Sequence, residues 1–371
     1  MKVKFVASPI MASMNKMKED AIHFFNDHGI ALEETEQPEA LIVLSGGSEE
    51  IAKDYLRDGL MLIPFGTANG LAASLEIQSY ALEHNLNVPL ISELSDTYIQ
   101  WLSILENLKK QNVGLIGKPS SWLIKSGDYT ILNQLNIPYM EIPLEELNAL
   151  LQEDQALANQ VWENATSSTI EKEEVVKGTK VYTALEKIVD KYKLTAFALR
   201  CFDMAVNLKI SGCLSLSTFN TKKIPAACEG DVESLVTMMV ANQLMGTPGF
   251  MINLARKNHP EYTFAHCTVA LDLVESYSLT THFETGYNVG INGKMPEGLY
   301  TALRMGKDKK YKYFVGETVE KPHVGNMCRT QITLKLKENP FRRSIGNHLV
   351  LVPGDWSKQL EVLQEFGWQL L

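Results

Sequence analysis

Short apolar strands alternate with helices through the first half of the chain, and this alternation constrains the fold more than any other feature. The run ALIVL at 40–44 contains no polar residue and is followed by the turn residues 45–48. Strands that are apolar on both faces are typical of a parallel sheet covered by helices. The first half therefore predicts a doubly wound α/β region. Similar apolar runs lie at 2–7, 59–64, 112–116 and 136–142, and helical patterns lie at 13–28, 71–84 and 144–164.

The second half of the sequence changes to a succession of strands, and the polar segment 166–180 indicates a boundary before it. We predict an α/β region at residues 1–170, built as one or two Rossmann-like domains with a candidate internal split near 95–112. Residues 171–371 are expected to form an α+β domain with a barrel-like antiparallel sheet. Its strands are expected at 194–205, 249–254, 263–269, 281–291, 298–305, 332–337 and 348–352, and its helices at 181–193, 232–244 and 356–366.

Composition excludes several classes of protein. Hydrophobic residues make up 45% of the 371 residues and charged residues 21%, which is the balance of a globular protein. The net charge of −9 argues against broad binding to nucleic acid or to anionic lipid. No apolar run approaches the roughly 18 residues that a membrane span needs. The five cysteines show no CxxC spacing, and the start has too short an apolar stretch for a signal peptide, so we expect reduced thiols in a cytoplasmic protein.

Glycine-rich turns follow several of the expected strands, where ligands bind in doubly wound sheets. The pair Gly46-Gly47 lacks the rest of a GxGxxG pattern, and the chain contains no Walker sequence. The chain also lacks GxSxG, HExxH and zinc-ribbon spacings. These turns are therefore better explained as structural than as nucleotide sites.

A few charged side chains in the second half are candidates for chemistry. Glu229 lies beside an expected helix start that Asp231 already caps, so its carboxylate is spare. His348 opens an apolar strand and is approached through glycine, a favourable place for a ligand, although a structural role is the simpler reading. His282 and Glu284 share one face of the strand expected at 281–291. That spacing suits a metal site or a proton relay, and it also suits a plain polar face.

Eight segments, taken in order along most of the chain, resemble those of the L-fucose and L-arabinose isomerase superfamily, and the chain is thus similar to an L-fucose isomerase-like protein. CEGDV and the GNH…LVPGD block are the most specific of these matches. The segments are TANGLAASLEIQSYA (67–81), IGKPSSWLIKSG (116–127), LRCFDMA (199–205), PAACEGDV (225–232), FMINL (250–254), FAHC (264–267), HFETGYNVGI (282–291) and GNHLVLVPGD (346–355).

The resemblance implies a divalent metal, typically Mn2+, held by two carboxylates and a C-terminal histidine, with a further histidine in the arabinose isomerase branch. The first carboxylate corresponds to Glu229, the intermediate histidine to His266 and the C-terminal histidine to His348. The second carboxylate corresponds to Asn253, whose amide oxygen can coordinate a metal but cannot act as a base. Glu284 is a candidate for the missing carboxylate.

The activity implied is metal-dependent aldose–ketose isomerisation of a pentose or deoxyhexose. The metal polarises the sugar carbonyl and stabilises an enediolate, while a base and an acid move the proton between C2 and C1. The alternative is a non-catalytic or regulatory sugar-binding homologue that has lost its second ligand at Asn253. The resemblance also implies a homo-oligomer, a trimer or hexamer. The remaining candidates for substrate binding are Arg200, His266, Lys118, Ser120 and Trp122, of which the last three are equally well explained as structural.

Overall fold

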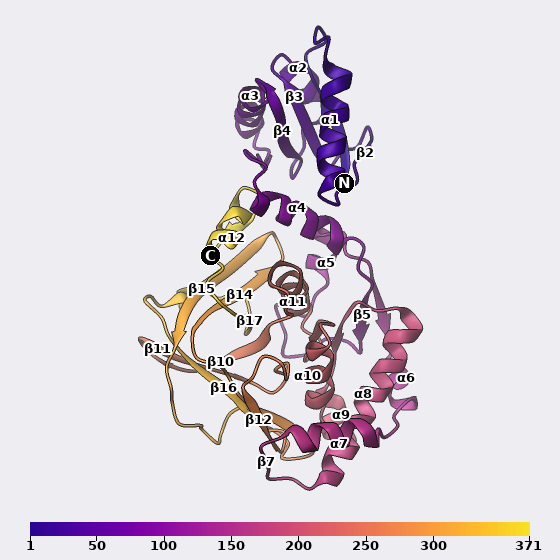
Figure 1. Cartoon of the computed structure of the whole chain (residues 1–371), viewed down its shortest axis with the longest axis vertical. Coiled ribbons are helices and arrows are strands. Elements are labelled where there is room, and N and C mark those ends of the chain that lie inside the picture. Colours follow the sequence, from indigo (N-terminus) through magenta and orange to yellow (C-terminus); the bar gives the residue numbers. More distant parts are fainter. The chain divides into compact units, whose positions relative to one another are not determined.

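The computed structural model describes residues Met1 to Leu371 (Figure 1). Internal contacts divide the chain into two compact units. The first unit comprises Met1–Asn107 together with Lys358–Leu370, and the second comprises Leu108–Ser357 with Leu371. None of the helices combines the length and the apolar composition that crossing a bilayer requires. The domain division expected at residue 170 stays a prediction.

The first unit is built on a four-stranded parallel sheet in the order β2-β1-β3-β4. Its strand β3, Ala40–Ser45, is buried along its whole length, as its apolar sequence predicted. The other strands of this sheet are β1 (Lys2–Val6), β2 (Glu33–Glu34) and β4 (Met61–Ala68), and the short strand β18 (Gln369–Leu370) is not part of it. The helices are α1 (Met14–Asp27), α2 (Glu49–Ala52), α3 (Gly70–Glu83), α4 (Asp96–Leu108) and α12 (Ser357–Glu361), with 3-10 turns at Lys53–Tyr55 and Val362–Gln364.

The second unit begins with another parallel sheet, in the order β6-β5-β8-β9. Its strands are β5 (Val113–Ile116), β6 (Tyr139–Ile142), β8 (Ala196–Leu199) and β9 (Ala226–Ala227). Because the strands are parallel, their carboxyl ends lie along the same edge of the sheet, where ligands bind in this class of fold. The parallel sheets confirm the predicted α/β class.

The remaining strands of the second unit form a closed antiparallel barrel in the order β14-β17-β10-β11-β16-β15, and β15 pairs with β14 to complete it. Phe250, Tyr262 and Phe264 belong to its buried core. The barrel confirms the predicted barrel-like sheet. Its strands are β10 (Phe250–Asn258), β11 (Glu261–His266), β14 (Leu299–Gly306), β15 (Lys310–Thr318), β16 (Thr330–Lys335) and β17 (His348–Pro353); a smaller sheet holds β7 (Ser167–Ser168), β12 (Ser276–Thr280) and β13 (Gly290–Lys294).

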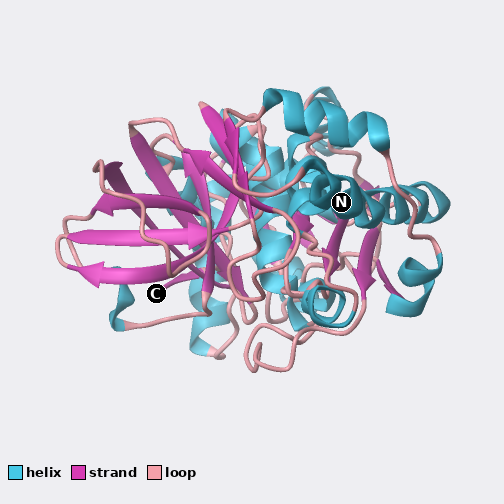
Figure 2. Ribbon diagram, turned by 90° about the horizontal axis from the view of Figure 1, so that it is seen from below, coloured by secondary structure: helices cyan, strands magenta, loops and turns pink.

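Within this unit the barrel strands gather on one side, and the helices with the parallel sheet gather on the other (Figure 2). Helix α11, Val232–Met245, contacts strands of both, namely β14 and β17 of the barrel and β8 and β9 of the sheet. It is buried nearly all round, as expected for a helix between two layers. The other helices are α5 (Thr130–Gln134), α6 (Leu144–Ala149), α7 (Gln155–Asn164), α8 (Lys172–Tyr192), α9 (Phe202–Asn207) and α10 (Cys213–Thr221), with a 3-10 turn at Pro340–Arg342.

Two of the predicted strands are wrong in ways that affect the site. The strand expected at 194–205 ends at Leu199, and helix α9 follows it, so Arg200 lies after the strand and not within it. The strand expected at 281–291 begins only at Gly290. Before it the chain turns through Gly286 and Asn288, which have positive φ values of 67° and 52°. A strand cannot pass through such left-handed residues, which explains the loop at 281–289.

Two predicted helices also differ from the structure. The long helix expected at 144–164 is two helices, α6 and α7, because the chain leaves the helix after Ala149. Asp154 starts α7 by accepting a hydrogen bond from the backbone N–H of Leu157 at 2.9 Å. The polar segment at 166–180 contains the first turns of α8, whose Val175 is fully buried. Charged residues on its outer face concealed that buried stripe in the sequence.

Candidate metal centre

Three neighbouring strands of the second parallel sheet end beside one another, and each is followed by candidate residues. Ser120 and Trp122 follow β5, Arg200 follows β8, and Glu229 follows β9. The backbone N–H of Ser120 donates a hydrogen bond to the carbonyl oxygen of Glu229 at 2.9 Å. The loop after β5 is thereby fixed to the loop after β9. This edge of the sheet is where a doubly wound fold is expected to bind a ligand.

Glu229 lies in a tight turn before helix α11. Glu229 and Gly230 both have left-handed backbones, with φ values of 61° and 73°. A Cβ atom on Gly230 would lie 2.8 Å from Cα of Pro119, so the close approach of the two loops requires glycine there. The following residue, Asp231, accepts a hydrogen bond from the backbone N–H of Ser234 at 2.8 Å and is the N-cap of α11, as predicted.

Two histidines come from adjacent parts of the barrel. His266 is the last residue of β11 and His348 is the first residue of β17. Strand β10 lies between them, and its Asn253 pairs with Ala265 on one side and with His348 on the other. The barrel register therefore places His348 directly opposite Asn253, while His266 is the residue after the one that pairs with Asn253. Leu349 belongs to the barrel core, so by strand alternation His348 points to the opposite face.

Glu229, His266 and His348 converge on one point. Each offers a ligand atom, and these atoms all lie within 4.8 Å of one another. Oε1 of Glu229 is 3.5 Å from Nε2 of His348. That nitrogen is buried and has no hydrogen-bond partner, which is costly for a polar atom away from water. The group combines residues from three separate segments, and its outer members, Glu229 and His348, lie more than one hundred positions apart in the sequence.

These three residues fit a divalent metal ion. The orphaned Nε2 of His348 points into the group, and a coordinating ion satisfies such an atom. One carboxylate and two imidazoles suit manganese, iron or zinc, and three protein ligands leave positions open for a substrate. On the far side of the His348 ring, Nδ1 lies 2.9 Å from Oδ2 of Asp231. A carboxylate there makes Nδ1 the protonated nitrogen and leaves Nε2 as the donor to a metal.

Burial and neighbouring charges determine the protonation of the group. Burial opposes ionisation of Glu229, but the interaction with His348 and the Trp122 hydrogen bond outweigh it and hold its pKa below the usual value. Burial likewise opposes protonation of His348, yet Asp231 and Glu229 raise its pKa. Burial and the charge of His348 lower the pKa of His266 to about 4. A carboxylate and a neutral imidazole are the forms that bind metal, so the shifts of Glu229 and His266 favour binding, whereas a metal ion must compete with a proton at His348.

Trp122 forms one wall of the site. Its Nε1–H donates a hydrogen bond of 2.6 Å to Oε2 of Glu229, and its ring meets that of Phe202 edge to face at 5.0 Å. Phe202 in turn contacts His282, with ring centroids 5.6 Å apart. The Trp122 side chain is half exposed, with a relative accessibility of 50%. A half-exposed aromatic ring beside a buried carboxylate is well suited to contact a bound sugar.

The other candidates for substrate binding lie around the same loop. Nη1 of Arg200 donates hydrogen bonds to the carbonyl oxygens of Lys118 and Pro119 at 3.4 and 3.2 Å, and its Nε pairs with Asp203 at 2.8 Å. Ser120 is buried and its Oγ has no hydrogen-bond partner, whereas the Lys118 side chain is exposed. Arg200 thus holds the backbone of the loop that carries Trp122.

Glu284 lies on the loop before β13 and not on a strand, so it does not share a strand face with His282. Its side chain is exposed. Desolvation by the surrounding protein nevertheless raises the pKa of Glu284, and the charge of Glu229 raises it further, while His282 acts in the opposite direction. Glu284 is therefore within electrostatic reach of Glu229. His282 is buried, and its Nδ1 lies 3.0 Å from Oγ1 of Thr285.

Sequence reasoning missed the buried ion pairs behind His348. Arg304 on β14 is fully buried and pairs with Asp231 at 3.1 Å and with Glu233 at 2.8 Å. Lys125 pairs with Glu233 from the loop after β5. One signal was available in the sequence: Arg304 is the single charged residue of the strand LYTALRMG, and arginine is seldom buried without partners.

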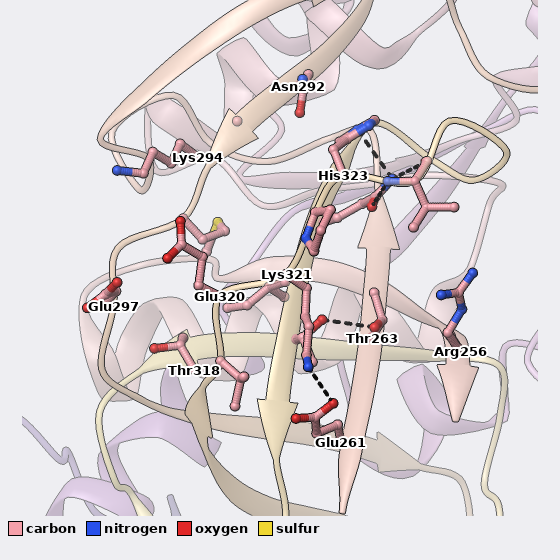
Figure 3. Close-up of a pocket in the computed structure, with 18 of the residues that line it drawn as sticks. Arg256, Glu261, Thr263, Asn292, Lys294, Glu297, Thr318, Glu320, Lys321 and His323 are labelled. Carbon is pink, nitrogen blue, oxygen red and sulfur yellow. Dashed lines mark hydrogen bonds and ion pairs between the residues drawn. The ribbon is translucent and has the colours of Figure 1, made fainter. Parts of the chain in front are cut away.

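A separate cavity of about 590 Å3 lies between barrel strands and the β12–β13 hairpin (Figure 3). None of the predicted site residues lines it. Its charged side chains carry both signs, and some are already paired, as in the ion pair between Lys321 and Glu261 at 2.8 Å. Thr263 and Thr333 on its floor also bond to each other, at 2.8 Å. The converging group at Glu229 is therefore the better candidate for a functional centre.

No protein-family model matches the chain. Among curated proteins, it is similar to the sulfoquinovose isomerase of Clostridium sp. (strain MSTE9), with 24% identity over 212 residues, which is 50% of this chain and 45% of the relative. It is also similar to the sulfoquinovose isomerase of Alkalicoccus urumqiensis, with 24% identity over 201 residues, 48% of this chain and 44% of the relative. The matches span less than half the length of these relatives.

Proposed function

We propose that this chain is a metal-dependent sugar isomerase that interconverts an aldose and a ketose. The convergence of Glu229, His266 and His348, with an unpartnered Nε2 on His348, is the observation that carries the proposal. The similarity to two sulfoquinovose isomerases supports the reaction type. We assign Mn2+ as the metal and a pentose or deoxyhexose as the substrate, following the resemblance of the sequence motifs to L-fucose isomerase-like proteins.

Each residue of the site has a role that follows from its contacts. Glu229, His266 and His348 hold the ion, with Asn253 beside His348 as a fourth, uncharged oxygen donor. A bound divalent ion supplies a Lewis acid for the sugar carbonyl. Trp122 donates to one oxygen of Glu229 and thereby directs the other oxygen towards His348.

Glu284 is our candidate for the group that moves the proton between C2 and C1. Partial burial and the nearby Glu229 raise its pKa above that of an ordinary glutamate. A carboxyl group whose pKa lies closer to neutrality both accepts and returns a proton efficiently. Asn253 cannot take this role, because an amide has no basic form near neutral pH.

The test is calorimetric titration of metal-stripped protein with Mn2+, alone and with a panel of aldoses and ketoses that includes sulfoquinovose. We expect Mn2+ to bind, and one sugar to tighten its binding. Glu229→Gln removes the charged ligand and is expected to abolish tight binding. The matched control is Glu320→Gln, an exposed carboxylate of the separate cavity, which should bind Mn2+ as the wild type does. Equal affinity in Glu229→Gln and the control would contradict the ligand role.

A second candidate function is sugar binding without turnover, and Asn253 favours it. Asn253 occupies the position where the resemblance implies the second carboxylate, and it lies directly opposite His348 in the β10–β17 ladder. A sugar that binds without conversion would support this alternative.

Light scattering on the same samples tests the trimer or hexamer that the resemblance implies.

A further inference from the structure

Arg304 contacts both the backbone and the ring partner of His348. Its Nη1 donates to the carbonyl oxygen of His348 at 3.0 Å and to Oδ2 of Asp231 at 3.1 Å. Its Nη2 donates to Oδ1 of the same carboxylate at 3.2 Å. Asp231 Oδ2 is also the acceptor for Nδ1 of His348, at 2.9 Å. A single guanidinium therefore fixes both the backbone position and the ring orientation of His348.

The same guanidinium is also connected, through Glu233, to the loop after β5. Nη2 of Arg304 donates to Oε2 of Glu233 at 2.8 Å, and Oε1 of Glu233 accepts from Nζ of Lys125 at 2.6 Å. Lys125 lies three residues after Trp122, whose indole N–H holds Glu229. These contacts therefore connect His348 to the loop that carries Trp122, the hydrogen-bond donor to Glu229.

The positive and negative charges of this network of buried ion pairs are equal in number. Asp231 and Glu233 supply two negative charges, and Arg304 and Lys125 supply two positive charges. Arg304, Asp231 and Glu233 are almost completely buried, while Lys125 reaches solvent. The loop before His348 is shaped to cover the guanidinium, since a Cβ on Gly346 would lie 2.8 Å from Nη2 of Arg304.

We propose that Arg304 is a positioning residue of this centre. It sets the tautomer and the position of His348, and it links this histidine to the loop that carries Trp122. The proposal rests on the proposed function in taking His348 and Glu229 as ligands. A buried ion pair can also serve stability alone. Arg304 also contacts the His348 carbonyl and shares the Asp231 carboxylate with the His348 ring. These contacts argue for a positioning role, because an ion pair that only stabilises the fold needs neither of them.

The experiment compares Arg304→Lys and Asp231→Asn with the wild type and with Arg342→Lys, an exposed arginine of the segment that leads to His348. Lysine keeps the charge at 304 but cannot donate to Asp231 and the His348 carbonyl in the same fork geometry. Asparagine keeps the shape of Asp231 and its acceptor for the Ser234 N–H. Two quantities are measured: Mn2+ affinity by calorimetry, and the His348 tautomer in metal-free protein at alkaline pH by long-range 1H–15N correlation.

We expect wild type and Arg342→Lys to hold the Nδ1–H tautomer, and both test variants to shift towards Nε2–H. We expect Mn2+ affinity to fall about 10- to 100-fold in the test variants, the usual effect of losing a partner behind a metal-binding histidine. Unchanged tautomer and affinity in a folded variant would overturn the proposal. If Arg304→Lys does not fold, Asp231→Asn decides. If the wild type binds no Mn2+, the proposed function fails, and the tautomer alone decides the role of Arg304.

Discussion

Replacing Gly230 by alanine should destabilise the second unit and open the site, and the cost can be worked from the backbone. Gly230 has a left-handed φ of 73°, where a Cβ costs about 1–2 kcal/mol. The added Cβ would also lie 2.8 Å from Cα of Pro119, a backbone atom that cannot rotate away. Overpacking of this kind costs about 1–3 kcal/mol. The total loss expected for Gly230→Ala is therefore about 2–5 kcal/mol.

Gly246 provides a matched control at the other end of helix α11. Its φ is 72°, almost the same as that of Gly230, but nothing lies within 4 Å of a Cβ built there. Gly246→Ala should therefore cost only the backbone part, about 1–2 kcal/mol. Alanine restricts the unfolded chain equally at both positions, so this effect cancels in the comparison.

The assay is urea unfolding followed by circular dichroism, in which a lower midpoint at constant slope reports lost stability. Gly230→Ala should lower the midpoint more than Gly246→Ala does, and it alone should weaken Mn2+ binding. The loop at Pro119 must move, and it carries the hydrogen bonds from Ser120 and Trp122 to Glu229. Equal midpoints for the two variants, with equal Mn2+ affinity, would refute the close-packing argument.

Three further predictions concern the ligands and their neighbours. Asn253→Asp should tighten Mn2+ binding in calorimetry, and an unchanged affinity would mean that Asn253 does not face the ion. His266 has its pKa lowered to about 4 in the metal-free protein, so its contribution to stability is complete above the unfolded value of about 6.5 and is lost as the pH falls from there towards 4. His266→Gln should flatten that part of the pH–stability curve, and an unaltered slope would contradict the burial argument. Trp122→Phe keeps an aromatic ring but removes the indole N–H, and should weaken Mn2+ binding about 10- to 100-fold; full affinity would assign Trp122 to substrate contact alone.

The fold class could be predicted because buried strands have recognisable patterns of apolar residues in the sequence. Strand β3 is apolar on both faces, which is typical of a covered parallel strand, and its prediction is confirmed. Strand β17 of the barrel is likewise a nearly continuous apolar run, in which Leu349 faces the core and His348 the other side. Errors arose where local backbone geometry decided the outcome. The loop at 281–289 depends on left-handed φ values at Gly286 and Asn288, and no periodicity reports those.

The candidate site was readable in part. Glu229 and His348 were singled out from their sequence context, and motif resemblance added His266. The structure brings the three together, while their role as ligands stays a prediction. Arg304 was not named, because a lone arginine in a strand does not show which carboxylates it meets. Its partners come from the start of α11, more than sixty positions earlier. Tertiary pairing of this kind is fixed by the packing of a helix on a barrel, which a single sequence does not display.

Helix α11 explains why a parallel sheet and a barrel combine into one site. The sheet supplies Glu229 in the turn before the helix, and the barrel supplies His348 beside the helix start. Asp231 serves both sides, because Oδ1 caps the helix at Ser234 while Oδ2 accepts from His348. Arg304 donates a hydrogen bond to each carboxylate oxygen of Asp231 and so holds the orientation in which Oδ1 caps the helix and Oδ2 faces His348. The residue that starts the helix therefore also orients the histidine, so the geometry of the candidate metal centre is set by the same contacts that dock the helix between the two layers.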